Sequence, residues 1–314
     1  MSLITTIGEI LVEIIATERG EGFREPQPLV GPFPSGAPAI FIDQVGKLGH
    51  PSAIVSAVGD DDFGQINLDR LKADGVDVSA VSVHRDIATG SAFVRYRRDG
   101  SRDFVYNIRH SANSRIGPSP AAAAVLARTA HLHVMGTSLS IPSVVGWIGE
   151  AIGGVKARGG SVSFDPNVRK EMLRNPQIGE ALRTVLANAD LFLPSGDELL
   201  MFAEASGEAK AVDRILAVGV EAVVLKRGAA GASYFDKSGE TRVASVPVDE
   251  VDPTGAGDVF GATFIVCRRN GMPVAEALGY ANAAGARNVT LTGPMEGTST
   301  FAELDAFRAE RAGV

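Results

Sequence analysis

The sequence predicts an α/β fold in which a doubly wound, mainly parallel sheet is flanked by helices and carries a small β-sheet lid. From about residue 119 to 228, short β-branched runs alternate with amphipathic stretches of helical length, a pattern typical of parallel sheets. Before that part, residues 90–107 alternate with period two around Asp99-Gly100, which indicates a hairpin. The 314 residues suit one large domain (1–314), with a lid formed by segments of about 10–35 and 88–110.

The elements of the alternating part have local signals. Ser119-Pro120 provides a helix N-cap followed by proline at the first helical position, and opens an alanine-rich helix over 121–130. Because ligands bind where parallel strands end, the loops after Asp165, Pro194 and Gly228 are candidate site loops. The predicted elements then follow in order: strand 131–136, helix 142–157, strand 161–165, helix 176–188, strand 191–194, helices 197–205 and 212–219, and strand 222–228.

The two ends of the chain break this alternation. The N-terminal run MSLITTIGEILVEIIAT predicts a first strand, and residues 9–30 look strand-like before the sequence becomes rich in glycine and proline over 31–38. Residues 232–248 predict a second hairpin that turns near Ser238-Gly239. This hairpin leads into the run VDPTGAGDVFG (251–261), which is followed by apolar residues numerous enough for a buried helix.

Charge and composition exclude several classes of partner. The 37 acidic and 30 basic side chains give a net charge of −7, and no basic stripe is visible, so we expect no nucleic-acid partner. No apolar run reaches the roughly 18–20 residues that a membrane span needs. The single cysteine, Cys267, lies in an apolar run and is interpreted as a packing residue. This cysteine usage fits the reducing cytoplasm, where we expect the protein to reside.

The run VDPTGAGDVFG places glycines beside carboxylates. Gly255, Ala256 and Gly257 precede the predicted helix, and free backbone N–H groups at a helix N-terminus form an anion site. Asp258 follows in the first turn. Taken alone, the pattern also fits a glycine turn with an aspartate that caps the helix.

Other site motifs are missing or do not fit. The spacing GAGDVFG does not match the dinucleotide pattern G-x-G-x-x-G, and no P-loop, G-x-S-x-G elbow or H-E-x-x-H helix occurs. His131 and His133 share one face of a predicted strand, but no third histidine or cysteine lies nearby in the sequence. We therefore interpret both histidines as structural and not as zinc ligands.

Five motifs together resemble one enzyme family. The run DPTGAGDVFGATF (252–264) resembles D-x-x-G-A-G-D, the C-terminal signature of the PfkB (ribokinase-like) carbohydrate kinases, and residues 35–64 are similar to the other family signature. FDPNVR (164–169), LPSGDE (193–198) and LKRGAAGA (225–232) also match, in family order. The resemblance covers nearly the whole chain and implies a ribokinase-like fold and an ATP-dependent sugar kinase.

The resemblance implies roles for the glycine loop. Asp258 would be the general base that takes a proton from a sugar hydroxyl as the γ-phosphoryl group moves. The N–H groups of Gly255, Ala256 and Gly257 would form the anion hole. Asp252 matches a position that supports a loop for a monovalent cation such as K⁺, and the later segment offers two further candidates, Asn288 and Gly293.

The resemblance also implies nucleotide and metal residues. Glu198 matches a glutamate of the motif N-x-x-E, which supports Mg²⁺ through water, but here Ser195 replaces the asparagine. Ser195-x-x-Glu198 equally fits a capping box, and the two roles are compatible. The adenine of ATP would lie among Lys226, Gly228, the loop before Asp252, and Asn282.

The sugar site would use residues from two parts of the chain. Glu13 stands where many members have an aspartate that holds sugar hydroxyls, and Gly36 and Ala37 align with the family's glycine loop. Asn167 and Arg169 follow a predicted strand, at the ligand edge of the sheet.

Two positions depart from the family pattern. Ser35 replaces the first glycine of the loop, and Ile40 replaces its asparagine. We therefore expect sugar contacts that differ from those of ribokinase, with Asp43 and Gln44 as candidates to compensate.

The segments GEILVEI and GPFPSGAPAIFIDQ most resemble the subgroup that includes kinases of tagatose and related ketohexoses. The resemblance thus predicts a ketohexose-type substrate such as tagatose or fructose, with ATP, Mg²⁺ and K⁺ as cofactors. One alternative is a 2-keto-3-deoxygluconate kinase, favoured by Arg169 and the Lys226-Arg227 pair, which would attract a carboxylate. Another is a non-catalytic sugar or nucleotide sensor on the same fold. A lid with an exposed apolar face tends to seek a partner, so we expect a homodimer through the lid.

Overall fold

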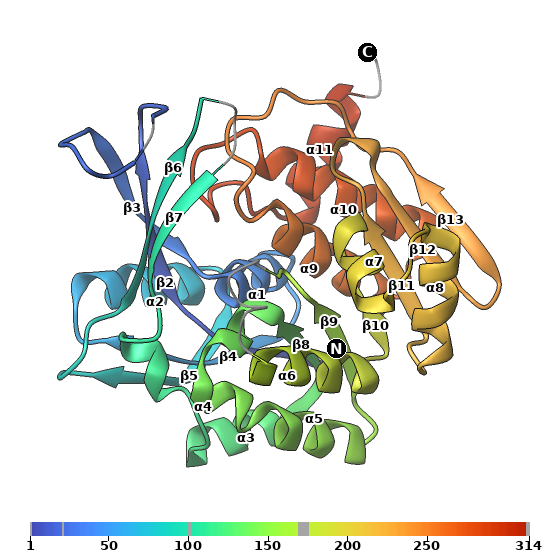
Figure 1. Cartoon of the computed structure of the whole chain (residues 1–314), viewed down its shortest axis with the longest axis horizontal. Helices are drawn as coiled ribbons and strands as arrows, with labels where there is room; N and C mark the ends of the chain where they lie inside the picture. The colour runs from blue at the N-terminus through green and yellow to red at the C-terminus, as the bar shows by residue number, and fades with distance from the viewer. Residues whose placement is uncertain (1, 21, 99–101, 169–175, 312–314) are drawn as a thin grey trace.

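The computed structural model of the chain describes residues 2–20, 22–98, 102–168 and 176–311. A nine-stranded sheet runs through the molecule, and its neighbours from β11 to β5 are parallel, whereas β12 and β13 are antiparallel (Figure 1). The expected doubly wound, mainly parallel sheet is confirmed. From edge to edge its strands are β13 (Gly239–Val243), β12 (Ala232–Asp236), β11 (Ala222–Lys226), β10 (Leu191–Phe192), β9 (Ser161–Asp165), β8 (Thr129–Met135), β1 (Leu3–Ile7), β4 (Ser52–Gly59) and β5 (Val76–His84).

Helices cover both faces of this sheet because the central strands are apolar on both sides. In β4, Ile54 and Val58 belong to one buried cluster, whereas Val55 and Ala57 belong to the other. The first cluster includes residues of α1 (Ala37–Lys47), α2 (Asp62–Ala73), α9 (Ala256–Arg269), α10 (Val274–Asn288) and α11 (Phe301–Arg311). The second includes residues of α3 (Pro120–Arg128), α4 (Pro142–Val145), α5 (Ile148–Ala157), α6 (Pro176–Asn188), α7 (Gly196–Ala203) and α8 (Glu208–Ala217). Short 3₁₀ segments are η1 (Ala112–Arg115), η2 (Gly136–Ser140) and η4 (Gly228–Ala230).

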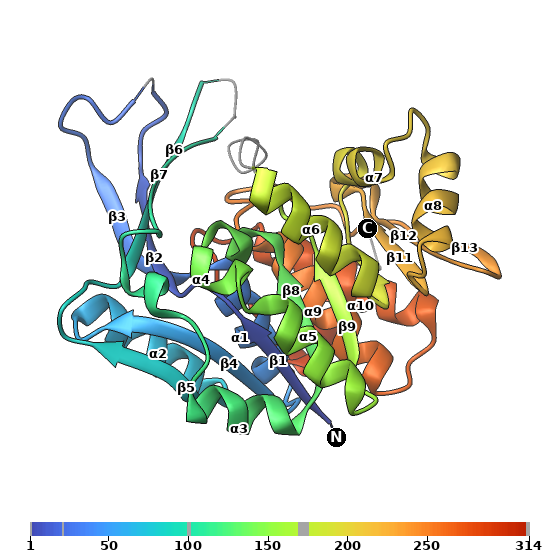
Figure 2. The same cartoon turned by 60° about the horizontal axis from the view of Figure 1, so that its bottom comes forward.

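The small sheet that the sequence predicts stands at one side of the main body (Figure 2). Its four strands, which we call the lid, are β3 (Leu29–Ser35), β2 (Leu11–Ala16), β6 (Gly90–Tyr96) and β7 (Arg102–Asn107). Residues 31–35 of the Gly/Pro-rich segment belong to β3, within the predicted lid segment of about 10–35. This strand lies at the edge of the sheet, where a proline does not remove a needed ladder hydrogen bond. The predicted turn at Asp99-Gly100 lies outside the described residues.

Two predicted elements are divided in the structure. The N-terminal run forms β1 in the large sheet and β2 in the lid, with a break at Gly8, where an added Cβ would collide with Ser138 Oγ. The predicted helix over 142–157 is interrupted at Gly146 and Trp147, between α4 and α5. In both places a glycine lies where a local pattern that looked continuous is interrupted, and at Gly8 the close approach of Ser138 requires it.

The paired histidines of β8 are structural, as predicted. His131 shares hydrogen bonds of 2.8 Å with Ser161 and Ser163, and the His133 ring stacks on Phe41 with 3.7 Å between centroids. Burial lowers the pKa of His131 to about 3, so the ring stays neutral at neutral pH. The described residues hold no cluster of histidine, cysteine and acidic side chains suited to a metal ion. Cys267 is fully buried, and no helix in the described ranges is long and apolar enough to cross a membrane.

Candidate active site

The glycine loop lies at the N-terminus of α9, as the sequence predicts. Gly255 is the N-cap residue in the left-handed conformation, with φ of +80°, and an added Cβ would lie 2.5 Å from the carbonyl oxygen of Pro294. Only glycine fits both conditions. Ala256 and Gly257 begin the helix, so their N–H groups and the positive end of the helix dipole lie at the loop. The loop can therefore bind an anion.

Asp258 lies one residue further along the first turn of α9 and is 6% exposed. Asn167, just after β9, donates from Nδ2 to Asp258 Oδ1 at 3.3 Å. Asn167 adopts a left-handed backbone with φ of +38°, a conformation that asparagine tolerates better than most residues. The amide of Asn167 thus orients the carboxylate of Asp258.

Two pockets meet at this loop. The larger has a volume of about 490 Å³ and the smaller about 280 Å³, and Lys226, Pro253 and Gly257 line both of them. The anion site at the start of α9 therefore lies on the boundary between two cavities. This arrangement allows a group bound in one pocket to be passed to an acceptor in the other.

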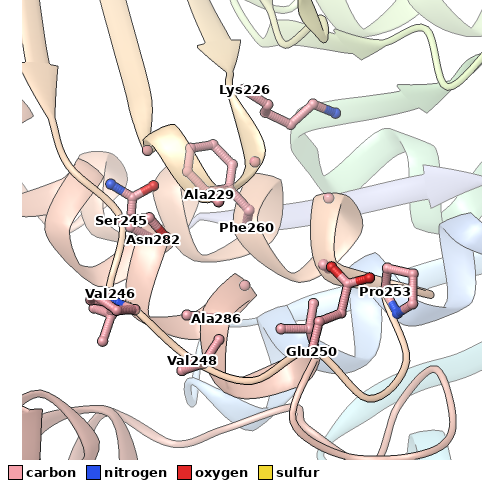
Figure 3. Close-up of a pocket in the computed structure, with 17 residues that line it drawn as sticks. Lys226, Ala229, Ser245, Val246, Val248, Glu250, Pro253, Phe260, Asn282 and Ala286 are labelled. Carbon is pink, nitrogen blue, oxygen red and sulfur yellow. The ribbon is translucent and has the colours of Figure 1, made fainter. Parts of the chain in front are cut away.

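The larger pocket contains the predicted nucleotide residues. Gly228 and Asn282 line it together with apolar residues, including Val246, Val248 and Phe260. Figure 3 shows Asn282 beside Ser245 at one end of this pocket and Pro253 beside Glu250 at the other. Asn282 Nδ2 donates to the carbonyl oxygens of Val243 and Ala244, at 3.1 and 3.0 Å, and so fixes the segment that forms one wall.

The smaller pocket brings together the predicted sugar residues within the described ranges. Its lining includes Asp258 and four of these residues, Glu13, Gly36, Ala37 and Asn167. Glu13, on β2 of the lid, accepts a hydrogen bond of 3.1 Å from Ser35 Oγ. Ser35 and Ile40, the two departures from the family pattern, also line this pocket.

Two predictions for the sugar site need correction, and one falls outside the described residues. Asp43 and Gln44 do not line the smaller pocket. Asp43 pairs with Arg70, and Gln44 Oε1 accepts from the Ser299 N–H at 2.7 Å, because these positions of α1 face the core near 298–299. Both side chains are fully buried and serve packing. Arg169 lies outside the described residues.

Lys226 lies at the junction of the two pockets, because it lines both of them. Its ammonium pairs with Asp165 at the end of β9, and it would lie 3.5 Å from a Cβ added to Gly257. Burial alone would lower the pKa of Lys226, but the charges of Asp165 and Glu198 outweigh it and raise the pKa. Lys226 is therefore a permanent cation beside the anion site. Burial raises the pKa of Asp165 to about 6.

Glu198 occupies the expected place and forms the expected capping box with Ser195. Its Oε1 accepts from the Val168 N–H at 2.8 Å, and its Oε2 accepts from the Ser195 N–H at 2.7 Å. Each carboxylate oxygen has two lone-pair sites, so both keep acceptor capacity toward the smaller pocket, which Glu198 lines. This donor set fits a hydrated Mg²⁺ ion held through water.

Asp252 is 2% exposed and anchors the loop that leads to Gly255. Its Oδ1 accepts from Tyr96 O–H at 2.6 Å and from Thr254 N–H at 3.0 Å, and its Oδ2 accepts from Gly293 N–H at 3.0 Å. Asn288 Nδ2 donates to the Thr254 carbonyl at 2.8 Å, whereas Asn288 Oδ1 is buried and has no hydrogen-bond partner in the described part of the chain. Such an orphaned oxygen fits a monovalent cation beside this loop.

Four side chains of the site escaped sequence reasoning: Asp165, Glu9, Tyr96 and Arg102. Asp165 ends a buried strand at the ligand edge of the sheet. Its position predicted that the following loop belongs to the site, but it did not predict a role for the Asp165 carboxylate. Glu9 is 2% exposed, lines the smaller pocket and accepts from Ser138 Oγ at 2.9 Å. Tyr96 and Arg102 belong to the lid, and no local pattern connects them to a loop so distant in the sequence.

The site consists of two adjoining pockets, with an anion site between them and a buried carboxylate beside it. This arrangement is typical of a group-transfer enzyme. The comparisons with known proteins identify the class: residues 1–300 match the model of the pfkB family of carbohydrate kinases, and the chain belongs to this family. It is a carbohydrate kinase with a ribokinase-like fold.

Individual relatives also have the names of sugar kinases. Fructokinase-2 of Zea mays is 29% identical, over 96% of this chain and 92% of its own length. An Escherichia coli protein provisionally named ribokinase II, solved with ATP and Mg²⁺, is 48% identical over 99% of this chain and 100% of its own, with a TM-score of 0.93. A double mutant of Vibrio cholerae fructokinase, bound to fructose, ADP and a potassium ion, is 26% identical over 98% of both chains, with a TM-score of 0.82.

Proposed function

We propose that this carbohydrate kinase transfers the γ-phosphoryl group of ATP to a hydroxyl of a neutral ketohexose-type sugar, such as fructose or tagatose. The observation that carries the proposal is the position of Gly257 on the boundary of both pockets, one residue before Asp258 in the smaller pocket. ATP occupies the larger pocket and the sugar the smaller one. The phosphates then reach the anion site from one side, and the hydroxyl reaches it from the other.

The chemistry follows from the residues at the boundary. Asp258 accepts the proton of the sugar hydroxyl as its oxygen bonds to phosphorus and the bond to the leaving ADP breaks. The N–H groups of Gly255, Ala256 and Gly257 hold the phosphoryl oxygens, and the Lys226 ammonium adds a positive charge beside Gly257. Asn167 keeps the Asp258 carboxylate oriented.

Glu198 would hold Mg²⁺ through water, and the metal would neutralise charge on the ATP phosphates. A K⁺ ion would lie at the loop that Asp252 anchors, with Asn288 Oδ1 as a ligand. In this assignment Asp252 supports the loop, because its two oxygens already accept three hydrogen bonds.

The charges of the smaller pocket favour a neutral sugar. Among the described residues, which do not include Arg169, its lining has two cations, Lys226 and Arg102, and four acids, Glu9, Glu13, Glu198 and Asp258. A carboxylate of 2-keto-3-deoxygluconate would meet the excess of acidic groups in this described part of the wall. Arg227, which the sequence offered as a carboxylate receptor, is instead held in a bidentate pair by Glu208 at 2.6 and 2.7 Å. A non-catalytic sensor has no use for a base beside an anion site.

A panel of sugars in a coupled ADP-release assay tests the proposed function. We expect the highest kcat/KM for a ketohexose, with 2-keto-3-deoxygluconate lower by at least about tenfold, the effect of 1.4 kcal/mol of lost transition-state binding. A higher kcat/KM for the acid sugar would reject the ketohexose assignment. Sugar binding without any ADP release would instead support the alternative of a non-catalytic sensor.

We also propose that the protein forms a homodimer through the lid. Exposed apolar side chains lie on its two edge strands: Leu29 and Val30 on β3, and Val105, 55% exposed, on β7. Val105→Lys should convert a dimer to a monomer in sedimentation velocity. The matched change Val218→Lys, at a residue 56% exposed on the C-cap of α8, should leave the dimer intact. A wild-type monomer at micromolar concentration would reject the dimer.

A further inference from the structure

The tip of the lid contacts the loop before the anion site through two neighbouring side chains. Tyr96 at the end of β6 and Arg102 at the start of β7 are paired across the strands. Tyr96 O–H donates to Asp252 Oδ1 at 2.6 Å, and Arg102 Nη1 donates to Thr254 Oγ1 at 3.2 Å. One cross-strand pair therefore reaches both ends of the short segment 252–254.

Asp252 connects this contact to the rest of the site. Its carboxylate accepts hydrogen bonds from the lid through Tyr96, from its own loop through the Thr254 N–H, and from the segment after α10 through the Gly293 N–H. Burial and Asp252 together raise the pKa of Tyr96, so the hydroxyl keeps its proton and remains a donor at neutral pH. A hydrogen bond to a buried carboxylate is among the stronger kinds.

A second lid strand contacts the same region. Gly293 has φ of +111°, and an added Cβ would lie 2.8 Å from Phe33 Cδ1 on β3. Gly293 therefore allows the Phe33 ring to approach while its own N–H holds Asp252. The lid thus contacts Asp252 both directly, through Tyr96, and indirectly, through the residue that holds its other oxygen.

The segment 252–254 controls the anion site because it leads straight into Gly255. Pro253 lines both pockets, and Thr254 precedes the left-handed N-cap residue that turns the first N–H groups of α9 toward the boundary. A shift of 1 Å in a positioning element can cost catalysis heavily. A contact that fixes Asp252 and Thr254 therefore fixes the direction of these N–H groups.

We propose that Tyr96 is a positioning residue that couples the sugar-binding side of the lid to the phosphoryl-binding loop. The inference rests on the proposed function, since the sugar pocket lies under the lid and the anion site serves phosphoryl transfer. The lid lines the sugar pocket through Glu13, and Tyr96 ties the same sheet to Asp252, so a sugar that stabilises this position of the lid also stabilises the loop. By thermodynamic reciprocity, sugar then tightens nucleotide binding by the same factor by which nucleotide tightens sugar binding.

The variant Tyr96→Phe removes the hydroxyl and keeps the ring. We expect kcat to fall by about tenfold to a hundredfold, the effect of losing one hydrogen bond to a charged group. The dissociation constant of ATP without sugar should stay unchanged, whereas its tightening by sugar should be lost. Tyr280→Phe is a matched control, because Tyr280 O–H also donates to an aspartate, Asp305, at 2.6 Å and lines neither pocket. It should keep wild-type kcat and coupling.

Calorimetric titration of a non-hydrolysable ATP analogue, with and without the best sugar of the panel, measures the coupling. Arg102→Gln gives a second test at an exposed position, where misfolding is not expected, and should weaken coupling in the same direction. Wild-type kcat and coupling in both Tyr96→Phe and Arg102→Gln would overturn the inference, as would equal losses in Tyr96→Phe and Tyr280→Phe. These results leave the proposed function intact, because it fails only if the wild-type enzyme phosphorylates no sugar.

Discussion

Replacing Asp258 by asparagine should lower kcat by about 10²–10⁴-fold, the range that a positioned general base contributes. The amide has nearly the same shape as the carboxylate, and it cannot accept the proton of the sugar hydroxyl. ATP affinity should change little, because Asp258 lines the smaller pocket and not the larger one. The variant therefore separates chemistry from nucleotide binding. Steady-state kinetics and calorimetric titration of ATP measure the two quantities.

Asp197→Asn is the control for this experiment. Asp197 also lies in the first turn of a helix, α7, but it is exposed and lines neither pocket. Its substitution should leave kcat within about twofold, since exposed changes of this kind rarely exceed 0.5 kcal/mol. Turnover of Asp258→Asn close to that of the wild type would show that another group takes the proton, and the assignment of the base would be abandoned.

Local sequence patterns predicted the parts of the site that local geometry determines. The anion site could be predicted because Gly255 and Gly257 lie at the start of the helix in the sequence. Only glycine can adopt the backbone conformation of Gly255 without a collision. The strands of the lid could be predicted because the alternation of apolar and polar residues along a strand is also a local pattern. The capping box of Ser195 and Glu198 spans four residues and was predicted for the same reason.

The residues that escaped prediction depend on contacts distant in the sequence. Asp165 and Lys226 are 61 positions apart, and Tyr96 and Asp252 are 156 apart. Neither pair has a local signature, because the topology of the sheet and the placement of the lid bring them together. The prediction for Asp43 failed for a related reason. Asp43 follows the glycine loop closely in the sequence, but its side of the helix faces Arg70 and Thr298 in the core instead of the sugar pocket.

Lys226→Met should both destabilise the protein and inactivate it, and these two losses have different causes. The substitution leaves the Asp165 carboxylate, 1% exposed, without its cation, and an uncompensated buried charge costs about 3–5 kcal/mol. It also removes the positive charge beside Gly257, where the phosphoryl group passes. Urea unfolding measures the first loss, and kcat measures the second.

The double variant Lys226→Met/Asp165→Asn separates the two causes. Without the carboxylate there is no unpaired charge to bury, so most of the free energy of unfolding should return, since replacing both members of a buried pair is often nearly neutral. Activity should remain lost, because the phosphates still lack the ammonium. Lys156→Met is the control: its pair with Asp190 is 37% and 22% exposed, and its removal should cost at most about 1 kcal/mol. A double variant that is stable and fully active would show that Lys226 serves only to neutralise Asp165, and the phosphoryl group would then depend on the α9 N–H groups alone.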